Sequence, residues 1–236
     1  MDIALLGSAP LRAGALRALY AFPDAPTLRM NFVATIDGAA TGSDDRSGSI
    51  NNAADKCVYD LNRALADVVL VGERTARLEG YLPGDPGEPP IVAVSRSGRI
   101  PAGWRSAPDP ASGGAVLVTC GGAGQGRLDA ARRLLGEEHV WVIGRDTVDL
   151  AGLKSDLAER GWGRILCEGG PTLFADLLEA GLVDELALSW VPRLIAGDGP
   201  RITAGRLTDA HLSRRHLLDI DGTLLGLWSV VSSPAS

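Results

Sequence analysis

Residues 166–173 read Leu-Cys-Glu-Gly-Gly-Pro-Thr-Leu and join an apolar strand to a helix through two adjacent glycines. Because glycine has no Cβ atom, a phosphate can approach this backbone closely. Pro171 presets φ for the first helical turn, whose unpaired N–H groups and dipole favour an anion. Glu168 stands at the mouth of the junction. The stretch therefore indicates an anion site between strand and helix, although a tight turn without a ligand has the same composition.

Strand-like and helix-like segments alternate outward from this junction. Strands are expected at 29–36, 67–71, 91–95, 115–119, 140–143 and 164–167, and helices at 128–135, 150–160, 172–180 and from a cap at Asn51 or Asn52 to Ala66. This alternation is typical of an α/β fold, with a mostly parallel twisted sheet and helices on both faces. The strand-like segments 185–191, 214–220 and 224–231 follow without clear helices between them. We therefore expect an antiparallel C-terminal edge.

The chain shows little sign of division into domains. Residues 1–26 are poorly patterned, with a short helix at 11–20 as the one candidate element, and we interpret them as an N-terminal extension. Loops rich in Gly, Pro, Asp and Ser interrupt the rest but do not separate halves of different composition. We expect a single domain at 27–236 that ends in a frayed tail.

Composition excludes several kinds of partner. A net charge of −6 and a pI near 5.1 argue against nucleic acid and anionic membranes, which require a basic face. Three cysteines lie far apart and three histidines lack paired spacing, so we expect neither disulfides nor a metal site. We find no export signal and no apolar run long enough to span a membrane, and expect a cytoplasmic protein.

Two further strand ends carry residues suited to phosphates. The strand at 67–71 passes through Gly72 into a short helix near Thr75, which is a second anion-ready helix start on the same sheet edge. Ser95 and Arg96 follow the next strand, where a hydroxyl and a guanidinium suit a phosphate monoester such as the 2′-phosphate of NADP. A solvated turn has the same composition, so the pattern alone leaves both interpretations open.

Two other motifs have ordinary explanations beside functional ones. Asp37 follows a strand in an Asp-Gly pair, which is common in turns. The glycine-rich run 121–126 follows a strand and precedes a helix, but no G-x-G-x-x-G register fits it. A flexible loop is favoured over a dinucleotide fingerprint there, and a place beside a cofactor groove stays open.

Four motifs, in this order, resemble the reductase domain of the bacterial riboflavin-biosynthesis deaminase/reductase and its stand-alone relatives, the pyrimidine reductase family. They are Thr35-Ile36-Asp37-Gly38, Asp67-Val68-Val69-Leu70-Val71-Gly72 with Thr75, Glu168-Gly169-Gly170-Pro171-Thr172-Leu173, and Gly181-Leu182-Val183-Asp184-Glu185-Leu186 leading into Pro192. The resemblance spans about residues 28–231 and implies a dihydrofolate-reductase-like fold. It implies that NADPH reduces the ring-opened ribose of a 5-amino-6-(5-phosphoribosylamino)uracil-type pyrimidine to a ribityl chain. It also implies a homodimer, for which the apolar run 182–191 suggests an interface.

The resemblance implies roles for individual residues. Cofactor contacts would come from Val33, Ser49, Thr75, Glu79, Ser95, Arg96, Gly169, Gly170, Pro171, Thr172, Leu173 and Phe174. Ser47, Arg63 and Glu168 would face the substrate, with the Arg63 guanidinium on its phosphate. As candidate catalytic residues, Glu168 would orient the substrate and assist proton transfer, while Asp37 would hold a loop over nicotinamide and substrate.

Asn31 is the third candidate catalytic residue and a departure from part of the family. Bifunctional bacterial members commonly carry a lysine there, whereas archaeal stand-alone reductases resemble this chain. Losing an ammonium removes a donor, which leaves the substrate and the stereochemical course open. The H-x-E and P-C-x-x-C signature of zinc deaminases is absent from the sequence. Two alternatives remain: reduction of dihydrofolate or another pterin on the same fold, and a catalytically silent NADPH-binding protein.

Overall fold

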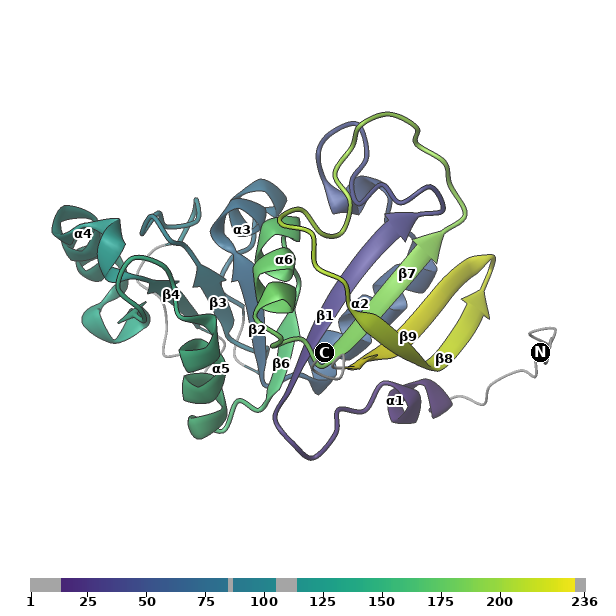
Figure 1. Cartoon of the computed structure of the whole chain (residues 1–236), viewed down its shortest axis with the longest axis horizontal. Coiled ribbons are helices and arrows are strands. Elements are labelled where there is room, and N and C mark those ends of the chain that lie inside the picture. The colour runs from purple at the N-terminus through teal and green to yellow at the C-terminus, as the bar shows by residue number, and fades with distance from the viewer. Residues whose placement is uncertain (1–13, 85–86, 105–113, 232–236) are drawn as a thin grey trace.

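The computed structural model describes residues 14–84, 87–104 and 114–231, whose strands form one nine-stranded sheet (Figure 1). In chain order the strands are β1 Thr27–Thr35, β2 Val68–Gly72, β3 Ile91–Val94, β4 Ala115–Thr119, β5 Val140–Val142, β6 Arg164–Cys167, β7 Glu185–Val191, β8 His211–Ile220 and β9 Thr223–Val231. Their order across the sheet is β5-β4-β3-β2-β6-β1-β7-β9-β8. Strands β1 to β7 run parallel, and β9 and β8 add antiparallel strands at one edge. The predicted mixed architecture is confirmed.

Helices cover both faces of this sheet. They are α1 Ala15–Leu19, α2 Ala53–Leu65, α3 Glu73–Glu79, α4 Gln125–Leu135, α5 Leu150–Glu159 and α6 Pro171–Glu179. Apolar residues of α5 and α6 pack on one face, in front of the sheet in Figure 1, and those of α2, α3 and α4 pack on the other. This confirms the expected helices on both faces of the sheet.

Helix α2 begins where the sequence predicts a cap. The Asn52 side-chain oxygen accepts hydrogen bonds from the backbone N–H groups of Ala54 and Asp55 at 3.1 and 3.0 Å. Its amide nitrogen donates to the Thr223 hydroxyl at 2.7 Å. One side chain thus satisfies two free donors of the helix and fastens the helix start to β9.

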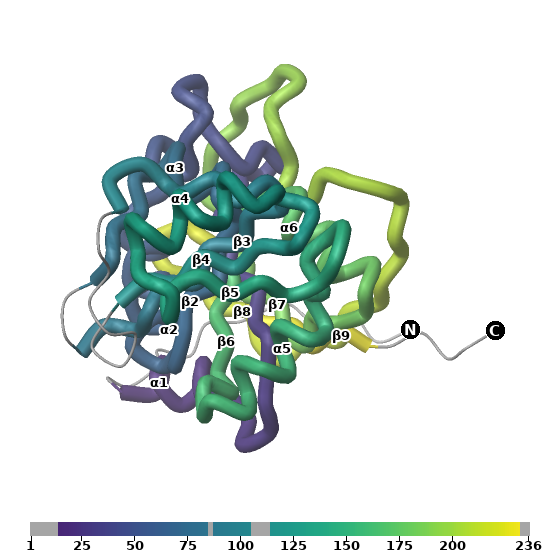
Figure 2. Tube along the Cα trace, turned by 90° about the vertical axis from the view of Figure 1, so that its left-hand side faces the viewer, coloured from purple at the N-terminus to yellow at the C-terminus, as the bar shows by residue number. Residues whose placement is uncertain are grey.

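Two loops stand side by side beyond the carboxyl ends of β1 and β7, as Figures 1 and 2 both show. They are residues 36–50 and 192–200, and backbone hydrogen bonds join them, including Ile36 N–H to Arg193 C=O at 3.0 Å and Ala40 N–H to Pro200 C=O at 2.8 Å. These loops form a wall on one side of the sheet edge.

Several predicted boundaries differ from the structure. The first helix is Ala15–Leu19 rather than 11–20, and residues 11–13 lie outside the described part. Helix α4 begins at Gln125, so the glycine run 121–126 is only partly a loop. Gly121 and Gly122 donate backbone hydrogen bonds to the carbonyls of Gly144 and Arg145 at 3.1 and 2.6 Å. Residues 121–124 are thus a hydrogen-bonded connection between β4 and α4, and their flexibility stays a prediction.

Most of the apolar run 182–191 is buried inside the sheet. Most of it is β7, which lies between β1 and β9 and is buried along nearly its whole length. Its apolar side chains are therefore core residues of a central strand. This part of the argument for a dimer was wrong, because a strand buried on both faces reads as continuously apolar in sequence.

The domain boundaries at 1–26 and 27–236 stay predictions. Within the described ranges, no helix has both the length and the apolar character that a membrane span requires.

Candidate functional site

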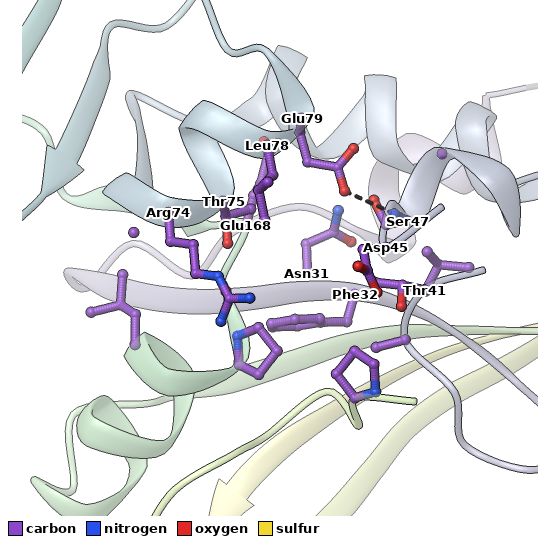
Figure 3. Close-up of a pocket in the computed structure, with 18 of the residues that line it drawn as sticks. Asn31, Phe32, Thr41, Asp45, Ser47, Arg74, Thr75, Leu78, Glu79 and Glu168 are labelled. Carbon is purple, nitrogen blue, oxygen red and sulfur yellow. Dashed lines mark hydrogen bonds between the residues drawn. The ribbon is translucent and has the colours of Figure 1, made fainter. Parts of the chain in front are cut away.

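A cavity of about 610 Å³ opens over the carboxyl ends of β1, β2 and β6 (Figure 3). Its lining includes Asn31, Phe32 and Val33 of β1, Ser47 and Gly48, Asp55 and Tyr59 of α2, Gly72, Arg74, Thr75, Leu78 and Glu79 of the β2–α3 segment, Tyr81, Glu168, and Gly170 to Leu173. Open α/β sheets bind ligands at this edge, beyond the carboxyl ends of parallel strands. The cavity is therefore the candidate site.

Two strand-to-helix junctions meet at the cavity. The Gly72 N–H at the end of β2 donates to the Gly169 carbonyl after β6 at 2.6 Å. A Cβ atom at Gly170 would lie 2.3 Å from the Thr75 hydroxyl oxygen, and one at Gly169, where φ is +88°, would lie 2.7 Å from the Phe32 ring. A side chain at either position would push the Thr75 hydroxyl or the Phe32 ring aside, and at Gly169 the positive φ also favours glycine, so glycine suits this close packing best. The predicted pair of neighbouring helix starts is present.

The Glu168 carboxylate lies at the centre of a cluster of donors. Arg63 donates from Nε to Oε1 at 2.8 Å and from Nη2 to Oε2 at 2.7 Å. The hydroxyls of Tyr59 and Tyr81 donate to Oε2 at 3.3 and 2.6 Å. Burial, reinforced by the Glu168 charge, raises the pKa of both tyrosines, so they stay protonated donors. Because four donors point at it, Glu168 is held in place as a carboxylate anchor.

This cluster changes what Arg63 can do. Burial disfavours its charge, but the hydrogen bonds and charge of Glu168 outweigh burial and raise the Arg63 pKa. The guanidinium also stacks over the rings of Tyr59 and Tyr81, at 4.8 and 5.3 Å from their centroids. Arg63 therefore supports Glu168 from outside the cavity lining. Arg74, exposed at the start of α3, is the cationic side chain among the described residues that line the cavity (Figure 3).

Asn31 projects from β1 into the cavity (Figure 3). Its side-chain oxygen accepts a long 3.5 Å hydrogen bond from the Asn62 amide nitrogen, and the Asn62 oxygen accepts one from Arg29 at 2.9 Å. Because a guanidinium can only donate, the Asn62 side-chain oxygen must face Arg29, and its nitrogen therefore faces the Asn31 oxygen. Asn31 keeps its N–H₂ group as a donor for the cavity.

The structure brings most of the predicted site residues together. Those that line the cavity are Asn31, Val33, Ser47, Thr75, Glu79, Glu168, Gly170, Pro171, Thr172 and Leu173. The Glu79 carboxylate accepts a hydrogen bond from the Ser47 N–H at 2.8 Å, drawn as a dashed line in Figure 3. Those outside the lining are Asp37, Ser49, Arg63, Ser95, Arg96, Gly169 and Phe174.

Asp37 is exposed and joins the two loops beyond β1 and β7. Its carboxylate accepts hydrogen bonds from the Thr35 hydroxyl at 2.5 Å and from the Ile195 N–H at 3.0 Å. The Thr35 hydrogen bond is the main reason why the Asp37 pKa lies below its ordinary value. Asp37 thus acts as a turn residue that holds a loop, which agrees with the interpretation of its Asp-Gly pair as a turn.

The remaining predicted residues lie around the cavity. Ser49 is exposed, and its hydroxyl donates to the Arg46 carbonyl at 2.9 Å. Phe174 stacks on Phe32, with ring centroids 5.2 Å apart, and so supports the cavity wall. Ser95 directly follows β3, which lies one strand beyond β2. Its hydroxyl is buried without a partner among the described residues, and Arg96 beside it is exposed.

Sequence reasoning missed Asp55, Tyr59, Arg74 and Tyr81. A signal existed for two of them, because Asp55, Tyr59 and Arg63 are spaced by four residues and so share one face of α2. Tyr81 and Arg74 carry no comparable local signal. Among the residues with described coordinates, no group of three His, Cys, Asp or Glu side chains is arranged to hold a metal ion.

Residues 26–225 match the family model described as the RibD C-terminal domain. The chain is 31% identical over 186 residues to a 2,5-diamino-6-ribosylamino-4(3H)-pyrimidinone 5′-phosphate reductase of Methanothermobacter thermautotrophicus, covering 75% of this chain and 82% of that protein. It is 27% identical over 195 residues to a protein of the same name from Archaeoglobus fulgidus, covering 76% and 87%. A pyrimidine reductase-like protein of Corynebacterium diphtheriae has the same fold, with a TM-score of 0.76, 24% identity, and coverage of 88% of this chain and 93% of that one.

Proposed function

Because the chain belongs to the RibD C-terminal domain family, we propose that it is an NADPH-dependent reductase of a ribosylamino-pyrimidine 5′-phosphate in riboflavin biosynthesis. One observation carries this proposal. The backbone at Gly169–Gly170 packed against Thr75, which we call the glycine cradle, and the Glu168 carboxylate with its donors lie at the same cavity. The names of the archaeal relatives, which align over most of their length, support the reaction and the substrate class.

The residues of the cradle fit a phosphorylated dinucleotide. Gly170 and the start of α6 offer backbone without a Cβ atom, and α6 begins with no side-chain cap on its free N–H groups. Thr75 and Arg74 add a hydroxyl and a cation on the facing side. When bound, the reduced nicotinamide would supply a hydride to the substrate.

Ser95 and Arg96 fit the cofactor's 2′-phosphate one strand farther along the same edge. Among the described residues the buried Ser95 hydroxyl has no partner, and its burial costs free energy unless a ligand or water satisfies it. The exposed Arg96 guanidinium beside it suits a doubly charged monoester. Together these two side chains support NADPH over NADH.

On the substrate side of the cavity, residues of this protein would bind and orient the substrate. Glu168, held by its four donors, presents a fixed acceptor to the sugar hydroxyls, and the Asn31 amide presents a donor on the facing strand. Arg74 is better placed than Arg63 for the 5′-phosphate or a cofactor phosphate, since the Arg63 guanidinium is paired with Glu168. A cytoplasmic homodimer remains part of the proposal, and light scattering of the purified protein tests the dimer.

The deciding experiment follows NADPH oxidation at 340 nm with ribosylamino-pyrimidine phosphates, dihydrofolate and other pterins. We expect turnover of the pyrimidine phosphate only, and an NADPH preference over NADH of about 2 kcal/mol, or roughly 30-fold, that Arg96→Ala largely removes. Turnover of pterins alone would assign the chain to that alternative. Tight NADPH binding without oxidation of any substrate would identify a silent binding protein.

A further inference from the structure

Asn62 is a fully buried residue of α2 that contacts the cavity residue Asn31 from outside the cavity lining. Its side-chain nitrogen donates to the Val58 carbonyl at 3.1 Å and to the Asn31 side-chain oxygen at 3.5 Å, and its side-chain oxygen accepts from Arg29 at 2.9 Å. Asn62 therefore connects a buried guanidinium to a side chain that faces the space for the ligand.

Two neighbours fix which way the Asn62 amide points. The Arg29 guanidinium can only donate, so it holds the Asn62 oxygen, and the Val58 carbonyl can only accept, so it holds the nitrogen. Arg29 is itself fixed, because Glu185 accepts from its Nε and Nη2 at 2.8 and 2.6 Å. A reversed Asn62 amide would place its oxygen against a carbonyl and its N–H₂ group against a guanidinium. The fold thus determines the orientation of Asn62 before any ligand binds.

The Asn62 nitrogen determines the orientation of Asn31 in turn. The terminal torsion of asparagine has two broad minima, so an unrestrained Asn31 would present either end of its amide to a ligand. Because the Asn62 nitrogen needs an acceptor, the Asn31 oxygen turns toward it. The N–H₂ group is the end of Asn31 left for the cavity (Figure 3).

We propose that Asn62 is a positioning residue for the reaction, which holds the Asn31 amide so that a hydrogen-bond donor, and not an acceptor, meets the bound substrate or nicotinamide. The ligand atom at this point is then an acceptor, such as a carbonyl or hydroxyl oxygen. Since the donor is already oriented in the free protein, binding needs no reorganisation of the amide. This inference rests on the proposed function and deepens it, because it assigns a role to a residue that acts on the site only through another side chain.

Asn62→Asp tests the orientation directly. The aspartate keeps one oxygen for Arg29 and places a second oxygen where the N–H₂ group was, so Asn31 should turn to donate to it and direct its own oxygen into the cavity. NMR of the free protein measures how fast the Asn31 side-chain N–H₂ protons exchange with water, and their loss in Asn31→Ala identifies the resonances. We expect exchange at least about 10-fold slower in Asn62→Asp, because the protons are then bonded to a buried carboxylate. An unchanged exchange rate would overturn the inference.

A kinetic double-mutant cycle separates positioning from a structural role alone. We expect Asn62→Asp to lower kcat/KM about 10- to 100-fold, and Asn62→Leu, which removes the amide, to lower it about 3- to 10-fold. In the Asn31→Ala background, Asn62→Leu should have no further effect, because no amide remains to be oriented. An equal loss in both backgrounds would overturn the inference.

Asn52→Asp is the matched control. It makes the same chemical change at the start of the same helix, outside the cavity lining, and aspartate also caps helices. The exchange rate of the Asn31 protons and kcat/KM should both stay at their wild-type values. Absent NADPH oxidation by the wild type with every pyrimidine phosphate and pterin would reject the proposed function, while the exchange rates in the free protein still judge Asn62.

Discussion

Glu168 and Asp37 show how the surroundings of a residue decide its role. Both are acidic residues beside a glycine, and the sequence proposes both as catalytic candidates. Glu168 is 7% exposed and accepts four hydrogen bonds in the cavity, whereas Asp37 is exposed and joins two loops. Since buried charged hydrogen bonds are stronger than solvated ones, Glu168 is the residue whose loss should matter most.

A double-mutant cycle tests the Arg63–Glu168 pair. Each single change, Arg63→Gln or Glu168→Gln, leaves a partly buried charge without its partner and should cost about 2 kcal/mol of unfolding free energy. The double variant should cost at least ~1 kcal/mol less than the sum of the two. Urea unfolding followed by circular dichroism measures these values. The exposed Lys56–Asp60 pair serves as the control, with an expected coupling below about 0.5 kcal/mol. Additive single effects would show that Arg63 and Glu168 are not energetically coupled.

At this site, strands and helices contact one another where each strand passes into its helix. The β2–α3 and β6–α6 junctions touch because β2 and β6 are hydrogen-bonded neighbours, although they are far apart in the chain. Glycine at 170 favours this contact, because the Thr75 hydroxyl occupies the space that a side chain would need. The cradle is thus a property of two elements together, and neither junction forms it alone.

Gly170→Ala should therefore separate the two junctions. We expect a loss of about 1 to 3 kcal/mol of stability from overpacking, together with weaker NADPH binding in a fluorescence titration. Gly126→Ala is the matched control, because a Cβ atom there, in α4, would meet nothing within 4 Å. That variant should keep wild-type affinity and gain up to about 1 kcal/mol in stability. Wild-type NADPH affinity in Gly170→Ala would argue against the cradle.

At the scale of the whole molecule, one buried arginine ties distant parts together. Arg29 is fully buried in β1 and donates from Nε and Nη2 to Glu185 of β7 at 2.8 and 2.6 Å. Its Nη1 donates to the Tyr20 carbonyl at 2.7 Å and to Asn62 of α2 at 2.9 Å. Arg215 of β8 also pairs with Glu185. The network therefore links the segment before β1 to the sheet. Through Asn62 it also orients the Asn31 amide in the cavity.

Arg29→Met tests this network. The change leaves Glu185 with only its exposed partner and frees the Asn62 amide, so we expect a loss of about 3 to 5 kcal/mol of unfolding free energy and a lower kcat/KM. Arg164→Met is the control, because Arg164 forms a similar pair with Asp67 but is half exposed, and should cost less than about 1 kcal/mol. Equal effects of the two substitutions in urea unfolding would show that burial does not decide the strength of these pairs.

Local patterns by themselves determined the alternation of strands and helices, the antiparallel edge, a helix cap at Asn51 or Asn52 and the glycine turn at 169–170. Apolar periodicity, capping and the conformational freedom of glycine act within a few residues, so they can be read from the chain. The local pattern also suggested a reason to consider Glu168. The same patterns misjudged the run 182–191, because apolar character does not distinguish a central strand from an interface.

Only the tertiary structure decided which polar side chains share the cavity. Arg63 and Glu168 are 105 residues apart, and Tyr81 lies in a segment without a pattern of its own. The tertiary structure places Arg63 outside the cavity lining and Asp55 within it. The physical reason is that the strength of a charge and the partners open to it depend on burial, and burial is set by strands and helices that meet from distant parts of the chain.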